Sequence, residues 1–284
     1  MTCEEAYRQG AKLLKNAGVA EYALDARLLL EHFCGVTRQD LLVHGDRSLA
    51  GREEQAYFQA VARRESRVPL QQITGTQEFM GLPFYVNENV LIPRQDTETV
   101  VEEALKVLKP GMELLDLCTG SGCILLSLLY YSEGCRGLGT DISDGALTVA
   151  ERNLRGISEK KELRAGLCKS DLFTSVTGRF DVIVSNPPYI ASEVIGTLEP
   201  EVKAHEPALA LDGGGDGLDF YRRMIPESGK YLREGGFIFL EIGYDQGAAV
   251  SDLMKAAGFA DVRVKQDLSG FDRVVSGRWK KNGA

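Results

Sequence analysis

Beyond residue 112, segments typical of β-strands alternate with segments typical of helices. The expected strands are Glu113–Leu117, Gly137–Asp141, Leu163–Lys169, Val182–Ser185, Phe237–Ile242, Ala260–Val264 and Arg273–Ser276. The expected helices between them are Cys123–Tyr131, Asp144–Arg155, Leu218–Leu232 and Gln246–Ala257. Such alternation predicts a mainly parallel sheet covered by helices on both faces. The loop around Gln266–Asp272 is too short to join parallel strands, so we expect six parallel strands and one reversed strand.

The first 75 residues follow a different pattern. Apolar residues recur there at helical spacing, and Thr2 with Glu5 forms a capping-box pattern. We therefore expect a bundle of four or five short helices over residues 1–75. Residues 76–92 carry β-favouring side chains between glycine turns and predict a hairpin-like connector. Residues 93–284 then form the α/β domain, so the predicted fold is a small all-α domain followed by a seven-stranded, Rossmann-like domain.

The distribution of charge argues against tight nucleic-acid binding. Residues 1–75 carry ten basic and ten acidic side chains, so the net charge of −8 lies in the rest of the chain. A nucleic-acid surface usually needs a basic excess, and no such excess is present. We therefore expect no direct nucleic-acid partner.

Sequence features also indicate a cytoplasmic protein that does not associate with membranes. The longest apolar stretch, Ile124–Tyr131, is far shorter than the ~20 residues that span a bilayer. Glu4 and Glu5 stand where a targeting peptide would need basic residues. The six cysteines form no C-x-x-C pair and the three histidines are scattered, so we expect neither disulfides nor a metal site.

A glycine-containing loop follows the first strand of the α/β domain. It consists of Cys118, Thr119, Gly120, Ser121 and Gly122 and leads into a helix. Glycines allow a tight turn and a close approach of the backbone to a ligand. Cys118 occupies the place of the first glycine of G-x-G-x-x-G, so the loop is poorly suited to a pyrophosphate. A simple helix-packing turn is the alternative interpretation.

Acidic residues follow the next two strands. Asp141 stands 21 residues after Gly120, where a carboxylate can accept hydrogen bonds from both hydroxyls of a ribose. Its alternative role is to cap the next helix. Asp171 follows the third strand and could accept from an adenine amine, or it could be an ordinary loop carboxylate. Together these positions predict a site for a nucleoside without a phosphate tail, for which S-adenosylmethionine is the common ligand.

The segment Asn186-Pro187-Pro188-Tyr189 directly follows the fourth strand. The prolines fix the backbone and remove two donors. The Asn186 side-chain oxygen and the Pro187 carbonyl can accept from the N–H groups of an amide-like nitrogen and favour a reactive, pyramidal geometry. Tyr189 can stack on a flat substrate group or face a cationic centre. A rigid strand-ending turn is the alternative. These features predict methyl transfer to an amide-like nitrogen, driven by positioning and electrostatics.

The ordered set of motifs resembles the bacterial release factor N5-glutamine methyltransferases, the HemK/PrmC family. It comprises Leu91–Glu98, Asp116–Gly122, Asp141, Asp171, Asn186–Tyr189 and Glu206-Pro207 with Gly213–Leu218. Gln95 and Cys118 depart from the usual family pattern, which has proline and often glycine there.

This resemblance implies a class I, S-adenosylmethionine-dependent methyltransferase. Its substrate would be the glutamine of the Gly-Gly-Gln loop of class I release factors. Residues 118–122, Asp141, Asp171, Leu172 and Asn186 would hold the cofactor. The substrate amide would be held by Asn186, Pro187, Pro188 and Tyr189, and Asn186, Pro187 and Tyr189 would carry the catalysis. We expect a monomer whose residues 1–75 dock the release factor.

Two other functions use the same motifs. Asn-Pro-Pro-Tyr also occurs in DNA and RNA amino methyltransferases, which act on a flipped base. A catalytically silent S-adenosylmethionine-binding module is the second alternative.

Overall fold

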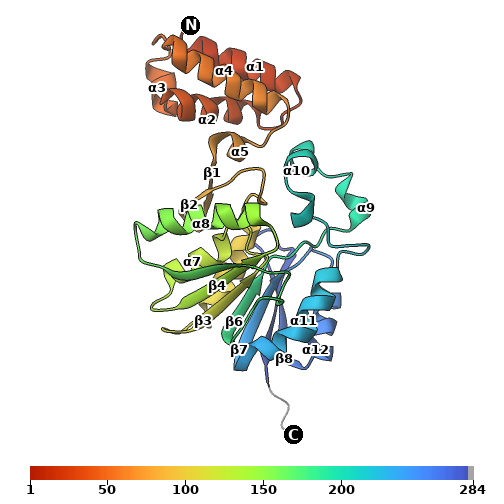
Figure 1. The fold of residues 1–284 in the computed structure, drawn as a ribbon. Coiled ribbons are helices and arrows are strands. Elements are labelled where there is room, and N and C mark those ends of the chain that lie inside the picture. Colours follow the sequence, from red (N-terminus) through yellow and green to blue (C-terminus); the bar gives the residue numbers. More distant parts are fainter. Residues whose placement is uncertain (281–284) are drawn as a thin grey trace. The chain divides into compact units, whose positions relative to one another are not determined.

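The computed structural model describes residues 1–280, which divide into two compact units (Figure 1). The helical unit comprises Met1–Thr76 and Glu199–His205. The sheet unit comprises Gln77–Leu198 and the chain from Glu206 onward. Residues 199–205 lie within the stretch expected to form the α/β domain, yet they pack with the N-terminal helices. Within residues 1–280, no helix has the length and apolar character needed to cross a membrane.

The helical unit contains six helices within the described chain. They are α1 (Cys3–Asn16), α2 (Tyr22–Cys34), α3 (Arg38–Val43), α4 (Gly51–Glu65), α5 (Leu70–Thr74) and α10 (Pro200–His205). The capping box at Thr2 is present, because its side chain accepts from the Glu5 N–H while Glu5 accepts from the Thr2 N–H. A core of buried apolar residues that includes Leu14, Leu29 and Tyr57 joins the longer helices.

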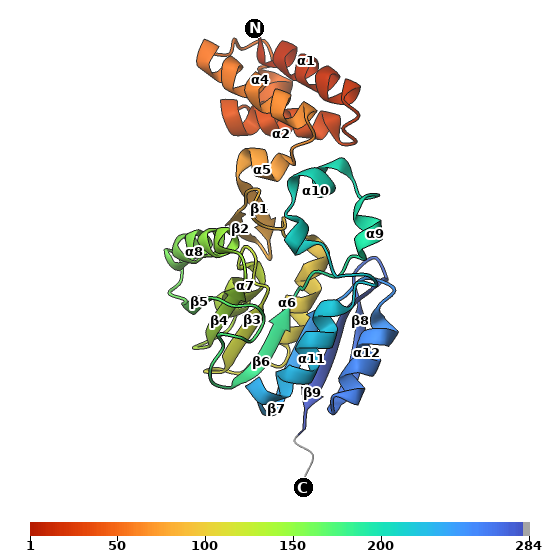
Figure 2. The same cartoon turned by 45° about the vertical axis from the view of Figure 1, so that its right-hand side comes forward.

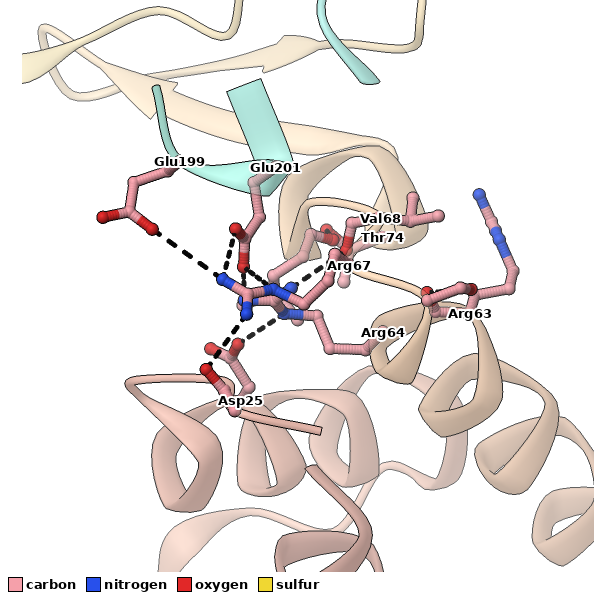
Figure 3. Close-up of polar contacts among 11 residues, drawn as sticks. Asp25, Arg63, Arg64, Arg67, Val68, Thr74, Glu199 and Glu201 are labelled. Atoms are coloured by element: carbon pink, nitrogen blue, oxygen red, sulfur yellow. Dashed lines mark hydrogen bonds and ion pairs between the residues drawn. The ribbon is translucent and has the colours of Figure 1, made fainter. Parts of the chain in front are cut away.

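A cluster of charged side chains holds α10 within the helical unit (Figure 3). Arg64 Nε donates to Asp25 Oδ2 at 2.7 Å, and Arg64 Nη2 donates to Glu201 Oε1 at 2.8 Å. Arg67 reaches both oxygens of Glu201, at 2.8 and 2.6 Å. Although burial opposes ionisation, the hydrogen bonds from both arginines hold the pKa of Glu201 at about 2. Glu201 therefore remains ionised near neutral pH.

We expect Arg64→Ala to lower the free energy of unfolding of the helical unit by about 3–5 kcal/mol, because Asp25 would stay buried without its partner. Both side chains of this pair are only 8% exposed. Hydrogen exchange of amides in α2 and α4 measures this free energy. Arg8→Ala is the control, since the Arg8–Glu4 pair is exposed and is worth about 0.5 kcal/mol or less. Equal protection in the two variants would contradict the expectation.

The sheet unit contains a small hairpin and one large sheet. The hairpin consists of β1 (Thr76–Phe79) and β2 (Leu82–Tyr85), within the expected connector. The large sheet has the order β5-β4-β3-β6-β7-β9-β8. Its strands are β3 (Glu113–Leu117), β4 (Arg136–Asp141), β5 (Arg164–Lys169), β6 (Phe180–Ser185), β7 (Leu232–Glu241), β8 (Phe259–Gln266) and β9 (Asp272–Trp279).

The strand directions confirm the predicted sheet. Strands β3 to β7 pair in parallel, whereas β9 is antiparallel to both β7 and β8. Strand β7 begins at Leu232, five residues before the expected Phe237. The reason is a register shift against β6, where Phe180 pairs with Leu232 and Val182 pairs with Phe237. The additional residues form an irregular entry to the strand and do not change its direction.

Helices cover both faces of this sheet (Figure 2). The helical segments of the unit are η1 (Gln95–Thr97), α6 (Glu98–Leu105), α7 (Cys123–Tyr131), α8 (Asp144–Ser158), α9 (Ser192–Ile195), η2 (Ala208–Ala210), α11 (Asp219–Tyr231) and α12 (Gly247–Ala256). One buried core packs α6, α7 and the hairpin against the sheet, and a second packs α11 and α12. The two cores fix the strands whose ends carry the candidate site.

Candidate active site

A pocket opens at the carboxyl ends of the strands. In the sheet order, strands run outward from β3 to β5 on one side and from β6 to β7 on the other. The junction between β3 and β6 is therefore a topological switch point, where parallel sheets bind ligands. The loops after both strands contribute to the pocket, and every lining residue belongs to the sheet unit. A concave site with a few polar groups at a switch point is typical of small-molecule binding.

Most of the residues expected to form the site line this pocket. They are Cys118, Thr119, Gly120, Ser121, Asp141, Asp171, Leu172, Asn186 and Pro188. The other three, Gly122, Pro187 and Tyr189, are not among the lining residues. Gly122 is instead the N-cap residue directly before α7, with φ +80°, a conformation that favours glycine.

The loop after β3 is held in left-handed conformations. Cys118 has φ +57° and Gly120 has φ +55°. For a residue with a side chain this conformation costs about 1–2 kcal/mol, so the rest of the fold must hold Cys118 in place. Asp116 helps to hold this loop in place, because its Oδ2 accepts a hydrogen bond from the Thr119 hydroxyl at 2.6 Å. Burial raises the pKa of Asp116 to about 7.

Asp141 joins the loop after β3 to the start of α8. Its Oδ2 accepts from the Gly120 N–H and its Oδ1 from the Ser143 N–H, each at 2.9 Å. Burial raises the pKa of Asp141, and these N–H groups oppose the rise. Ser143 caps α8, because its hydroxyl accepts from the Ala146 N–H. Asp141 is therefore not the side chain that caps this helix, and its carboxylate keeps acceptor capacity toward the pocket.

Asp171 lines the pocket but already has a partner. Both of its carboxylate oxygens accept from Arg223 Nη2, at 2.8 and 2.7 Å. Its neighbour Leu172 is buried and has φ +50°. A ligand amine at Asp171 would have to share the carboxylate with Arg223 or displace it.

The Asn186–Tyr189 loop presents two free acceptors. Asn186 Nδ2 donates to Thr97 Oγ1 at 3.4 Å, and within residues 1–280 neither Asn186 Oδ1 nor the Pro187 carbonyl oxygen accepts a hydrogen bond. The Tyr189 hydroxyl donates to Glu241 Oε1 at 3.2 Å. Burial raises the pKa of Tyr189, so this tyrosine stays protonated. The loop can thus accept two N–H groups from a bound amide.

Glycines behind the loop allow the chain to approach it closely. A Cβ atom on Gly213 would lie 2.8 Å from Tyr189 Cα, and one on Gly217 would lie 2.3 Å from the Tyr189 carbonyl oxygen. Gly217 also has φ +74°. The same carbonyl oxygen accepts from Gln246 Nε2 at 3.0 Å. These contacts fix the backbone after the two free acceptors.

Several pocket residues were not expected from the sequence. They include Asn89, Val90, Pro93, Arg94, Thr97, Pro207, Leu209 and Phe220. Arg94 Nη2 donates to both oxygens of the buried Glu206, at 2.7 and 2.8 Å. Burial raises the pKa of Glu206, and the charge of Arg94 opposes the rise. Arg94, Thr97 and Pro207 belong to motifs that carry the family resemblance, which is the signal that could have placed them here.

Comparison with known proteins agrees with these features. The chain matches the family model of the PrmC N-terminal domain over residues 5–75 and that of the methyltransferase small domain over residues 97–201. The release factor glutamine methyltransferase of Caulobacter vibrioides is 44% identical over 280 residues, which cover 98% of this chain and 96% of that protein. The protein of the same name from Geobacter sulfurreducens is 43% identical, with coverages of 93% and 92%.

A solved structure supports the fold independently. A methyltransferase from Pyrococcus furiosus matches with a TM-score of 0.53 and 18% identity, covering 71% of this chain and 90% of that one. This likeness concerns the fold, whereas the sequence matches extend over almost the whole chain. The chain therefore belongs to the family of release factor glutamine methyltransferases.

Proposed function

We propose that this protein transfers a methyl group from S-adenosylmethionine to the side-chain amide nitrogen (N5) of the glutamine in the Gly-Gly-Gln motif of class I release factors. One observation carries the proposal. The two free acceptors of Asn186 and Pro187 lie in the loop that borders the pocket at the strand ends, in a chain 44% identical to a release factor glutamine methyltransferase.

The residues around the pocket suit S-adenosylmethionine. The backbone of residues 118–122 allows close approach of a nucleoside, and no lysine of the phosphate-binding type stands in this loop. Asp141 can accept from ribose hydroxyls, while Asp171 and Leu172 border the same pocket. When bound, S-adenosylmethionine supplies an activated methyl group.

The substrate amide is held by the loop after β6. Asn186 Oδ1 and the Pro187 carbonyl oxygen accept its two N–H groups, which orients the nitrogen lone pair. Pro188 keeps the backbone rigid, and the ring of Tyr189 packs over the amide. Catalysis then depends on positioning and on preorganised dipoles, with no strong general base.

The same assay separates this function from its alternatives. The purified protein is incubated with S-adenosylmethionine and a release factor, and the Gly-Gly-Gln peptide is analysed by mass spectrometry. A gain of one methyl group on the glutamine is expected. Methylation of DNA or RNA in place of the release factor would indicate an amino methyltransferase for nucleic acids, and no turnover would indicate a silent binding module.

This substrate implies the protein partner and the cellular compartment of the enzyme. The helical unit docks the body of the release factor, because one glutamine offers too little surface for selection among cellular proteins. Translation termination takes place in the cytoplasm, so the enzyme acts there. It acts as a monomer, and the net charge of −8 gives it no general attraction to nucleic acid.

We expect Asp141→Ala to raise the dissociation constant of S-adenosylmethionine at least about tenfold, because hydrogen bonds to a charged group contribute about 1.5–3 kcal/mol each. The loss also removes the acceptor for the Gly120 N–H. Calorimetric titration measures the affinity. Asp144→Ala is the control, since Asp144 is exposed and does not line the pocket. An unchanged affinity in Asp141→Ala would remove this residue from the cofactor site.

A further inference from the structure

Arg94 is a positively charged side chain that lines the pocket. Of the lining residues, all of which lie within residues 1–280, it alone carries a positive charge. The other charged lining residues are Asp141 and Asp171, which follow β4 and β5. The guanidinium of Arg94 stays charged at any pH at which the protein is folded. A negatively charged part of a ligand is therefore attracted to Arg94 and not to the two carboxylates.

Most of the hydrogen-bond donors of Arg94 are free. Its Nη2 donates to both oxygens of Glu206, whereas Nε and Nη1 donate no hydrogen bond to any residue from 1 to 280. The side chain of Glu206 is 1% exposed, and that of Arg94 is 42% exposed. The buried carboxylate thus holds one nitrogen of the guanidinium. A further acceptor can bind the free N–H groups without displacing Glu206.

Arg94 lies close to the Asn186 end of the pocket. Its carbonyl oxygen accepts from the Thr97 N–H at 3.1 Å, and the Thr97 hydroxyl oxygen accepts from Asn186 Nδ2 at 3.4 Å. Asp141 instead contacts the loop after β3 and the start of α8. The pocket therefore has a carboxylate suited to ribose hydroxyls at one place and a cation near the amide-holding loop at another.

The chemical groups of S-adenosylmethionine match this distribution. Its sulfur carries the adenosine, the methyl group and an amino-acid chain that ends in a carboxylate. When Asp141 accepts from the ribose and the methyl group faces the amide held by Asn186, the amino-acid chain is the part of the cofactor left for Arg94. Its carboxylate needs a charged or N–H partner when it leaves water. Charge-assisted hydrogen bonds from a guanidinium are among the strongest that a protein can offer.

We propose that Arg94, held in place by Glu206, binds the carboxylate of the amino-acid part of S-adenosylmethionine. The inference rests on the proposed function, since it takes S-adenosylmethionine as the methyl donor. Glu206 is then a positioning residue, because it orients Nη2 of Arg94. Its negative charge also limits the repulsion between Arg94 and the positively charged sulfonium.

The test compares two ligands that differ only in this carboxylate. Calorimetric titration gives the dissociation constants of S-adenosylmethionine and of decarboxylated S-adenosylmethionine for the full-length protein and for Arg94→Gln. We expect Arg94→Gln to raise the constant for S-adenosylmethionine at least about tenfold and to weaken the binding of the decarboxylated ligand no more than about twofold. Asp141→Ala should weaken both ligands alike, since both carry the ribose. Arg155→Gln is the matched control and should change neither constant, because Arg155 pairs with Glu151 on the surface and does not line the pocket.

Equal losses of affinity for the two ligands in Arg94→Gln, or an unchanged affinity for S-adenosylmethionine, would overturn the inference. Unchanged affinity together with a raised KM for release factor would assign Arg94 to the protein substrate instead. If Arg94→Gln does not fold, the double variant Arg94→Gln/Glu206→Gln takes its place, because it leaves no buried charge unpaired. A wild-type protein that binds neither ligand would overturn the proposed function, and the inference with it, whereas failure of the inference alone leaves wild-type binding intact.

Discussion

Replacing Asn186 with alanine is expected to lower the single-turnover rate of methylation by about 10²–10³-fold, because a preorganised polar partner of the reacting group is lost. Cofactor binding should stay largely intact, since the contacts of Asp141 and of residues 118–122 with the cofactor remain. Asn186 has one oxygen free to accept within the described chain, and its nitrogen is occupied by Thr97. Rapid-quench measurements with saturating release factor report the chemical step directly.

Two controls make this result specific. Gln266→Ala removes an exposed amide from β8 in the same unit, and it should leave the rate unchanged. A release factor with glutamate in place of the loop glutamine should give no product, because the N–H groups are missing. A near-normal rate for Asn186→Ala would contradict the role of this side chain in holding the amide.

The strand directions of the large sheet could be predicted from the sequence, because they depend on local features. Alternating strands and helices require parallel pairing, and the short loop around Gln266–Asp272 requires a reversal. The start of β7 could not be predicted, because the irregular pairing between Phe180 and Leu232 depends on contacts across 52 positions.

The pocket residues at the strand ends could be predicted by the same reasoning. Parallel strands bring their carboxyl ends to one edge, so residues such as Asp141 and Asn186 could be placed there from their spacing alone. Thr97 and Glu241 could not, because one precedes the sheet and the other ends its fifth strand in chain order. Thr97 binds Asn186 and Glu241 binds Tyr189, and these contacts depend on the strand order and on the position of α6, which no local pattern encodes.

The sequence also did not predict that α10 belongs to the helical unit. Residues 199–205 follow the Asn-Pro-Pro-Tyr motif closely in sequence, so they were expected to belong to the α/β domain. They are held instead by Arg64 and Arg67, more than 130 positions earlier. Ion pairs of this kind carry no periodicity, and their partners cannot be identified from charge alone.

The largest effect on substrate selection is expected when residues 1–75 are removed. The truncated chain should retain cofactor affinity, because all residues that line the pocket lie in the sheet unit. The cut precedes Phe79 and Phe84, which are buried in the core of that unit. Its kcat/KM for intact release factor should fall about a hundredfold, chiefly through KM, since a loss of about 2.7 kcal/mol of docking free energy corresponds to that factor.

Truncation also removes the arginines that bind Glu201, so two controls are needed to separate docking from local damage. In the intact chain, Glu201→Gln weakens only the anchoring of α10 and should change KM for release factor much less than truncation does. A short peptide that contains Gly-Gly-Gln lacks the body of the release factor that the helical unit would dock, so full-length and truncated enzymes should methylate it with similar kcat/KM. Circular dichroism must first show that the truncated chain is folded. If that chain methylates intact release factor as efficiently as the full-length enzyme, the helical unit does not dock the substrate.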